Sequence, residues 1–365
     1  MLSVIEYRRA LHRIPELDDQ LPETCAYVRS ALAGFGLVPF SPIPSSVCAF
    51  LDAGRPETAA FRADMDALPI REATGLPYAS AHSGAMHACG HDANTAMTLA
   101  LAEYASEHRE ELPRNVLFLF QPSEETTGGA ERLCGTGLLE KHRVSRVFAM
   151  HLWPGLELGK VFSRPGPIMA RSNEVTVTLT GKSVHIGKAS EGIDALAAGA
   201  EFLLQAYAMT DGLPGEEPVV LRFGKMVSGS VRNAVSGETR LEGSLRTFRD
   251  ETQAAVRQGL ERIGREIGLE TGCAVEVYLN EGYPAVWNHE ALFEAVRSAL
   301  PELQPLDAPT LTAEDFSFYQ RRSPGLFFLL GVGETAALHS PEFCFNDELV
   351  LPQGVEFLKR LLVME

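Results

Sequence analysis

Short runs of consecutive apolar residues recur along the chain, each about as long as a β-strand. They lie at residues 59–62, 115–121, 146–150 and 325–330. Runs of this kind are typical of parallel strands that are covered on both faces. Segments with helical spacing precede or separate them: residues 5–35, where we predict one helix with a break near Pro15, and residues 96–105, in a helix that we expect to end near Glu107. Strands that alternate with helices predict an α/β sheet.

The pattern changes between about residues 173 and 284. Residues 174–180 alternate between polar and apolar side chains, as an antiparallel strand with one solvated face does. The predicted order of elements is strand, helix, strand, strand, helix, strand, which is that of a ferredoxin-like α+β unit. We therefore predict a first domain made of residues 1–172 and 285–365, with residues 173–284 inserted into it as a second domain.

Composition and charge argue against several classes of protein. The chain has 365 residues, 45% of them hydrophobic and 22% charged, which is ordinary for a globular protein of two domains. A net charge of −16 argues against a nucleic-acid or anionic-membrane partner. No apolar run reaches ~18 residues, and no signal peptide is visible. Six scattered cysteines do not form a disulfide pattern, so we expect a cytoplasmic protein.

Candidate metal chemistry begins at residues 86–92 (Met-His-Ala-Cys-Gly-His-Asp). Cys89 and His91 place a thiol and an imidazole two residues apart, directly before a predicted helix that Asp92 is expected to cap. A thiol with an imidazole suits a zinc-like divalent cation better than Mg²⁺ or Ca²⁺. Two ligands do not make a site, so the remaining ligands have to come from elsewhere in the chain.

The ends of the predicted strands supply such residues. Asp64 and Asp66 follow the first apolar run, and the others are Glu124, Glu125, His151 and His339. Ligands gather beyond the carboxyl ends of the strands in α/β sheets, so these side chains are expected to meet. The set contains five possible metal ligands and one further carboxylate. Because neighbouring side chains diverge in an extended segment, one of the two adjacent glutamates can bind metal while the other faces a water molecule.

Simpler interpretations of the same residues stay open. Cys89 could be a small core residue, or a nucleophile whose thiol pKa is lowered at a helix N-terminus. His12 and Glu16 are expected to be structural. The remaining histidines outside the inserted segment are expected at the surface or in packing roles: His82, His87, His108, His142 and His289.

Five motifs together resemble the amidohydrolase branch of the aminoacylase and glutamate carboxypeptidase superfamily. This branch includes hippurate hydrolases, auxin-conjugate hydrolases and N-acetyl-diaminopimelate deacetylases. The matching segments run from residue 62 to 69, 87 to 92, 121 to 125, 151 to 154 and 338 to 341, with weaker matches at 12–16 and 314–316. Each segment is short, but their joint occurrence in this order is highly specific. The resemblance covers nearly the whole chain, from about residue 7 to residue 352.

The resemblance implies a role for each candidate residue. It implies a hydrolase domain with a mixed sheet flanked by helices, and two divalent ions per subunit, with zinc, manganese and nickel as candidates. Glu124 would be the general base, and Asp64 and Asp66 would support or line the site. The implied metal ligands are Cys89, His91, Glu125, His151 and His339.

The inserted domain carries further implied roles. By resemblance it closes over the substrate and forms a homodimer. His185 would reach the neighbouring subunit's site and stabilise the oxyanion. Asn233 and Arg246 would contact the substrate, and a planar two-pronged donor such as Arg246 is well suited to the substrate's carboxylate.

The chain departs from this pattern at one place. Similar proteins usually carry Gly-His-Thr after the aspartate of the metal motif, whereas this chain has Ala93-Asn94-Thr95.

The expected activity is hydrolysis of the amide bond of a small N-acyl amino acid. Two alternatives remain: a dipeptidase or carboxypeptidase that uses the same site, and a catalytically silent binding protein on the hydrolase scaffold.

Overall fold

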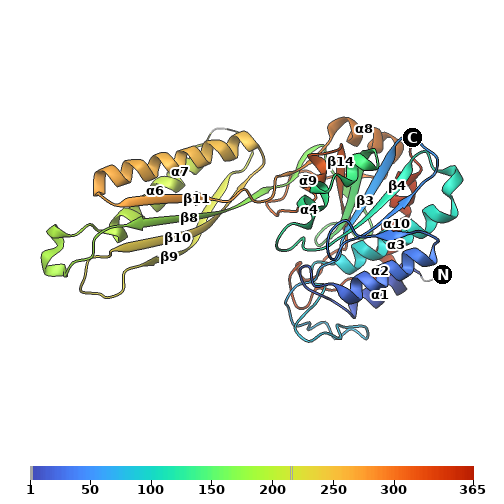
Figure 1. Ribbon diagram of the computed structural model, residues 1–365, viewed down its shortest axis with the longest axis horizontal. Coiled ribbons are helices and arrows are strands. Elements are labelled where there is room, and N and C mark those ends of the chain that lie inside the picture. The colour runs from blue at the N-terminus through green and yellow to red at the C-terminus, as the bar shows by residue number, and fades with distance from the viewer. Residues whose placement is uncertain (1–2, 214, 216) are drawn as a thin grey trace. The chain divides into compact units, whose positions relative to one another are not determined.

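The computed structural model describes residues 3–213, 215 and 217–365 (Figure 1). The chain splits into two compact units. The first unit contains Met1–Ile168, Val286–Ala308 and Asp315–Glu365, and the second contains Met169–Ala285 and Pro309–Glu314. The segment Pro309–Glu314 therefore joins the second unit, although the sequence pattern assigned it to the first domain.

A mixed sheet runs through the first unit. Within the described residues its strand order is β1-β2-β4-β3-β5-β14-β6-β13. The central pairs β4–β3, β3–β5 and β5–β14 are parallel, whereas β1–β2, β2–β4 and β14–β6 are antiparallel. The strands are β1 (Pro39–Phe40), β2 (Val47–Leu51), β3 (Thr58–Asp64), β4 (Asn115–Gln121), β5 (Val144–Trp153), β6 (Val161–Ser163), β13 (Gln304–Pro305) and β14 (Gly325–Gly331). A separate pair joins β7 (Gly166–Met169) to β12 (Val286–Asn288).

Helices cover both faces of this sheet, which explains why its central strands are continuously apolar. One face carries α1 (Val4–His12), α2 (Pro22–Gly34), α3 (His91–Glu107), α8 (Glu290–Ala299) and α10 (Asp347–Leu362), whose side chains join the strands in a single core. The other face contacts α4 (Gly129–Gly135) and α9 (Ser317–Gln320). Two short helices complete the unit, η1 (Arg109–Glu111) and α5 (Leu138–Lys141).

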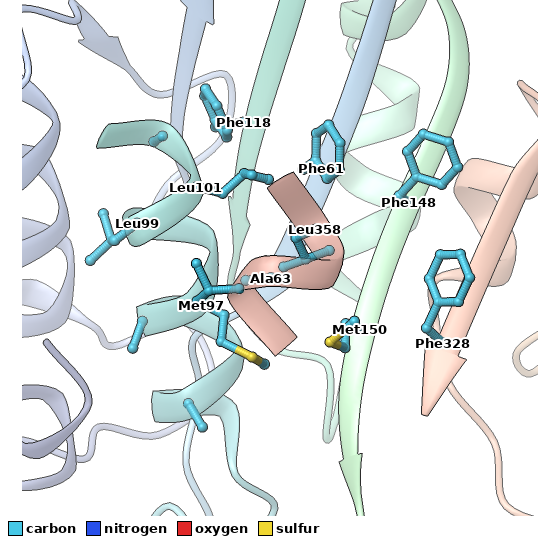
Figure 2. Close-up of a cluster of buried hydrophobic side chains, with 14 of the residues drawn as sticks. Phe61, Ala63, Met97, Leu99, Leu101, Phe118, Phe148, Met150, Phe328 and Leu358 are labelled. Carbon is cyan, nitrogen blue, oxygen red and sulfur yellow. The ribbon is translucent and has the colours of Figure 1, made fainter. Parts of the chain in front are cut away.

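The core lies between the sheet and the helices α3 and α10 (Figure 2). Met97, Leu99 and Leu101 of α3 and Leu358 of α10 are buried with strand residues such as Phe61, Phe118, Phe148 and Phe328. Burial of each such side chain contributes about 1.5–3 kcal/mol. Along β14, Phe328 belongs to this core, while the preceding Phe327 packs against Phe316 with ring centroids 5.4 Å apart. The predicted α/β class, with a mixed sheet flanked by helices, is confirmed.

Two of the predicted helices differ from the structure in their limits. Residues 5–35 form two helices, α1 and α2, because the chain leaves the helical conformation around Pro15 and re-enters it at Pro22, where a missing N–H costs nothing. The helix that contains residues 96–105 runs from His91 to Glu107, so it ends where we predicted but begins one residue before its predicted cap, Asp92. It is buried on nearly all sides in its first half, so no polar face marks its beginning.

The second unit has its own sheet and core. Its elements are β8 (Arg171–Thr180), η2 (Ile186–Glu191), α6 (Ala195–Asp211), β9 (Val220–Ser228), β10 (Glu238–Thr247), α7 (Asp250–Thr271) and β11 (Ala274–Leu279). The antiparallel strand order β11-β8-β10-β9 with two helices is the ferredoxin-like arrangement. Its buried core includes Val177, Phe202 and Leu260.

Among the helices of the described part of the chain, none combines the length and the apolar character that crossing a bilayer requires.

Candidate active site

The predicted site residues of the first unit meet at one edge of its sheet. Strands β3, β4, β5 and β14 run parallel, so their carboxyl ends lie together. Glu124 and Glu125 follow β4, His151 lies within the last residues of β5, and His339 lies in the loop after β14. Cys89 directly precedes α3 and His91 begins it, and α3 packs on β3, β4 and β5.

Two groups of three side chains have the composition and spacing of metal sites. Cys89, His91 and His151 form the first group, and Cys89, Glu125 and His339 form the second. Within each group, one potential ligand atom per residue lies within 4.8 Å of the others. Cys89 belongs to both groups. A further group joins Glu124 to His91 and Glu125 at the same spacing, so the additional carboxylate lies beside the proposed ligands.

The local backbone brings Cys89 and His91 to this position through a glycine. Gly90 is the N-cap of α3 and has φ 85°, in the left-handed region that favours glycine. A Cβ atom at this position would lie 2.8 Å from Cδ1 of Leu152. The prediction that Asp92 caps the helix is wrong: Asp92 lies in the first turn, and its carboxylate pairs with Arg8 and His12.

The orientation of both buried imidazoles suits metal binding through Nε2. Nδ1 of His91 donates to the backbone carbonyl of Asp66 at 2.7 Å, and Nδ1 of His151 donates to the carbonyl of Leu152 at 2.8 Å. A carbonyl only accepts, so Nδ1 carries a proton in both residues, and Nε2 is the nitrogen that could bind a metal ion. Nε2 of His91 is buried without a hydrogen-bond partner among the described residues. A metal ion would take the place of a proton at this buried nitrogen and give it a partner.

The electrostatics of the site also fit a cation. Burial, together with the nearby Glu125 and Glu124, raises the pKa of the Cys89 thiol well above its ordinary value. Burial lowers the pKa of His151 to about 4. Burial would also lower the pKa of His91, but Asp64, Asp66 and Glu125 raise it to about 10. A divalent cation would relieve this concentration of negative charge and stabilise the thiolate.

Asp66 positions the two glutamates. Its Oδ1 accepts from the backbone N–H of Glu124 at 2.9 Å, and its Oδ2 accepts from that of Glu125 at 3.1 Å. The backbone carbonyl of the same residue holds His91. Asp66 is 1% exposed, so these bonds are shielded from water. One aspartate therefore orients three of the residues that the sequence assigned to the site.

Asp64 belongs to a buried network beneath the site. Its carboxylate accepts from Nη1 of Arg62 at 2.6 Å and from Nδ2 of Asn94 at 2.8 Å, and its Oδ2 lies 3.8 Å from Nε2 of His91. Burial works to raise the pKa of Asp64, but His91 and Arg62 hold it well below its ordinary value. Asn94 is 2% exposed. The departure from the family pattern therefore lies in this buried support and not on an exposed surface.

Arg62 extends this network across the sheet. It also donates to Asp315 at 2.7 Å and to Gln121 at 2.9 Å, and Gln121 donates to Asp315 at 2.7 Å. Sequence reasoning did not assign a role to Gln121 or Asp315. Both lie within segments that match the family motifs, and this match is the sequence signal that could have identified them.

A second buried network surrounds the first turn of α3. Nε of Arg8 donates to Asp92 at 2.8 Å, and its Nη1 donates to Asp347 at 3.1 Å. Nδ1 of His12 lies 2.7 Å from Asp92. His12 is structural, as expected. His87 is buried in a packing position, with its ring centroid 6.4 Å from that of His12.

Two loop residues of the site have left-handed backbone conformations. Ser123, directly before Glu124, has φ 58°, and His339 has φ 66°. Such residues cost of order 1–3 kcal/mol and concentrate at functional sites. The backbone N–H of His339 donates to the carbonyl of Ala88 at 2.9 Å, which fixes the loop beside Cys89. Nε2 of His339 lies 3.2 Å from Oε1 of Glu125.

The three predicted residues of the second unit lie within that unit as follows. His185 precedes η2, and its neighbour Ile186 donates its backbone N–H to the carbonyl of Asn233 at 2.9 Å. His185 also pairs with Ala234 in an antiparallel bridge. His185 and Asn233 are therefore neighbours, and both are exposed. Arg246 lies on β10, and burial lowers the pKa of its half-buried guanidinium.

Comparison with known proteins gives a consistent family. The sequence profile described as Peptidase family M20/M25/M40 matches residues 60–364. An N-acetyldiaminopimelate deacetylase from Limosilactobacillus fermentum is 33% identical over 369 residues, covering 98% of this chain and 95% of that protein. The deacetylase of that name from Lacticaseibacillus paracasei is 34% identical over 367 residues, covering 97% and 95%. The structure of a dinuclear metal-binding peptidase of the M20 family from Bacillus subtilis, the YXEP protein, matches with 31% identity and a TM-score of 0.87, covering 99% and 96%.

Proposed function

The chain belongs to peptidase family M20/M25/M40 and is a hydrolase of amide bonds, and we propose that it removes the acyl group from N-acyl amino acids with two divalent metal ions. This family assignment agrees with the resemblance inferred from the sequence motifs. The single observation that supports the dimetal site best is that Cys89 belongs to both groups of candidate ligands. A thiolate shared in this way would hold two ions close together, as two-metal hydrolases require.

The proposed ligands divide between the two groups. His91 and His151 would bind one ion, Glu125 and His339 would bind the other, and Cys89 would contact both. The B. subtilis relative is described as a dinuclear metal-binding peptidase, which supports two ions here as well. Zinc, manganese and nickel remain the candidate ions, since mixed sulfur, nitrogen and oxygen ligands suit all three.

Glu124 is the proposed general base. When bound, two divalent ions supply a Lewis acid for the acyl carbonyl and lower the pKa of an attacking water. Glu124 would take the proton of that water and pass it to the nitrogen of the leaving amine. Asp66 would hold the backbone of Glu124 in place through the 2.9 Å hydrogen bond to its N–H. His91 and His151 would bind through Nε2, because backbone carbonyls accept hydrogen bonds from their Nδ1–H groups.

An N-acetyl amino acid is the proposed substrate class. The support is that two relatives, each at least 33% identical over nearly the whole chain, are described as N-acetyldiaminopimelate deacetylases. Arg246 and Asn233 would contact the substrate, and Arg246 would bind a carboxylate with two parallel N–H groups. We place the protein in the cytoplasm, where its six cysteines would remain free as they are in the structure.

A homodimer through residues 173–284 completes the proposal, with this domain also closing over the substrate. Strand β9 is at an edge of its sheet, and Met226 and Val227 on it are exposed. On the adjacent helix α6, Leu196 and Leu204 are 49% and 68% exposed. An exposed apolar edge strand is a ready surface for pairing with a second chain. In such a dimer the partner subunit's His185 would stabilise the oxyanion.

The proposed function is tested with a panel of substrates on purified protein. Metal content is measured first, and the protein is then assayed with added Zn²⁺, Mn²⁺, Co²⁺ or Ni²⁺. N-acetyl and N-benzoyl amino acids should be hydrolysed faster than dipeptides. Faster hydrolysis of dipeptides would favour the dipeptidase or carboxypeptidase alternative. Fewer than one tightly held ion per chain, with no hydrolysis under any metal, would favour a silent binding protein.

A further inference from the structure

A pocket separate from the proposed catalytic site lies between helices α1, α2 and α3. Its volume is about 490 Å³, within the range of small-molecule sites. Its lining includes Tyr7, Tyr27, Gly34, Phe35, Glu103 and Glu107. His91 begins α3 and Glu103 lies near its other end, about 18 Å away at 1.5 Å per residue. The pocket is thus distinct from the proposed metal site.

Two polar atoms of residues that line this pocket have no hydrogen-bond partner within the described part of the chain. Oε2 of Glu103 accepts from the hydroxyl of Tyr7 at 3.1 Å, but its Oε1 is shielded from solvent and makes no hydrogen bond within the described part of the chain. The hydroxyl of Tyr27 is also shielded from solvent and has no hydrogen-bond partner among the described residues. A buried carboxylate oxygen without a donor costs free energy. Glu103 is only partly buried, so a rotation of its side chain toward the pocket would present this oxygen to a ligand that donates hydrogen bonds.

The charge of the lining selects the class of ligand. The lining residues include two carboxylates, Glu103 and Glu107, and neither lysine nor arginine is among them. Tyr7 and Tyr27 stay neutral, because burial raises the pKa of both phenols. An anion would be repelled from this lining. An ammonium group carries three donors and a positive charge, which suits both a carboxylate and aromatic rings.

The apolar residues of the lining indicate that the rest of the ligand is apolar. Tyr7 is 3% exposed and packs edge-on against Phe35 with ring centroids 6.2 Å apart, and Tyr27 and Ala31 add further apolar surface. We propose that this pocket binds a protonated organic amine with an apolar body about the size of one aromatic ring. Glu103 binds the ammonium group, and the rings of the lining hold the body.

Calorimetric titration of the metal-loaded full chain with 2-phenylethylamine tests this proposal. 2-Phenylethanol and phenylacetate are the neutral and anionic comparison ligands. Glu103→Gln removes the charge that binds the ammonium group, and Glu110→Gln, at an exposed glutamate, is its control. Gly34→Leu fills the pocket from α2, where a Cβ atom would meet nothing within 4 Å. These variants also separate pocket binding from binding of the amine at the catalytic site.

The wild-type chain and Glu110→Gln should bind one amine saturably. Binding should be at least tenfold weaker in Glu103→Gln and lost in Gly34→Leu, while both variants keep the wild-type thermal midpoint and hydrolytic rate. Equal binding of the alcohol or of phenylacetate would overturn the proposal. So would undiminished amine binding in Glu103→Gln, or no saturable binding by the wild-type chain up to ~10 mM. Should Gly34→Leu fail to fold, the comparison of Glu103→Gln with Glu110→Gln still decides.

Discussion

The carboxylate of Asp66 accepts a hydrogen bond from the backbone N–H of Glu124 at 2.9 Å. The proposed general base is therefore positioned by a residue from a different strand end, 58 residues earlier in the chain. The same carboxylate holds the backbone of Glu125. This relationship makes Asp66 a positioning residue, since it acts on the site through its neighbours.

Asp66→Asn should lower kcat about 10–100-fold, the usual effect of losing a supporting hydrogen bond at a metal site. The asparagine side chain has one oxygen acceptor, whereas the backbone N–H groups of Glu124 and Glu125 each donate to a separate oxygen of Asp66. The measurement is kcat and KM for an N-acetyl amino acid, together with metal content. Asp307→Asn, at an exposed aspartate, is the control. A kcat equal to that of the control would contradict the positioning role.

Cys89→Ala should remove more metal than any other single ligand substitution, because Cys89 belongs to both ligand groups. We expect both ions to be lost from Cys89→Ala and one from His339→Ala. Elemental analysis of the purified variants after dialysis measures this difference. Cys344→Ser, at a half-buried cysteine, should keep wild-type metal content. Equal loss in Cys89→Ala and His339→Ala would show that the thiol is not shared.

Arg8→Met should destabilise the fold by about 3–5 kcal/mol, the usual cost of leaving a buried charge without its partner. Arg8 is 1% exposed and pairs with Asp92 and Asp347. Urea unfolding of the metal-free chain measures the free energy of unfolding without the contribution of bound ions. Arg109→Met, at an exposed arginine, should change it by less than about 0.5 kcal/mol. A small effect of Arg8→Met would mean that water replaces the guanidinium.

Asp347 should make stability depend on pH in the acid range. Burial works to raise its pKa, but hydrogen bonds from Arg9 and Arg8 and their charges hold it below the ordinary value. A carboxyl whose pKa is lowered by folding adds stability above its unfolded pKa of about 3.9 and loses that contribution as pH falls through the folded value.

The difference in unfolding free energy between wild type and Asp347→Asn should therefore be largest at pH 5–7 and shrink below about pH 4. Urea unfolding at a series of pH values measures this difference. Glu348→Gln is a suitable control, because Glu348 also pairs with Arg9 but its side chain is 68% exposed. A difference that stays constant down to pH 3 would mean that Asp347 does not titrate differently on folding.

The sheet of the first unit could be predicted because both of its faces are covered. Double coverage makes β4 and β14 continuously apolar, and their carboxyl ends then bring Glu124, Glu125 and His339 together. The order of elements in residues 173–284 was also sufficient for the ferredoxin-like arrangement. Both patterns are local, so the sequence alone records them.

The buried ion pairs could not be predicted, because they join residues that are far apart in the chain. Arg8 and Asp347 are 339 residues apart, and Arg8 and Asp92 are 84 apart. Asp92 has the residue type of a helix cap, but the tertiary contact with Arg8 places it in the first turn and leaves the cap to Gly90. Likewise, nothing in the sequence shows that Asn94 supports Asp64.

Glu124→Gln tests the central claim most directly. The amide keeps the shape of the side chain but cannot take a proton, so kcat for an N-acetyl amino acid should fall on the order of 10²–10⁴-fold. Metal content should stay at the wild-type level, and Glu131→Gln, at an exposed glutamate of α4, should keep wild-type activity. Near-full activity of Glu124→Gln with unchanged metal content would contradict the account.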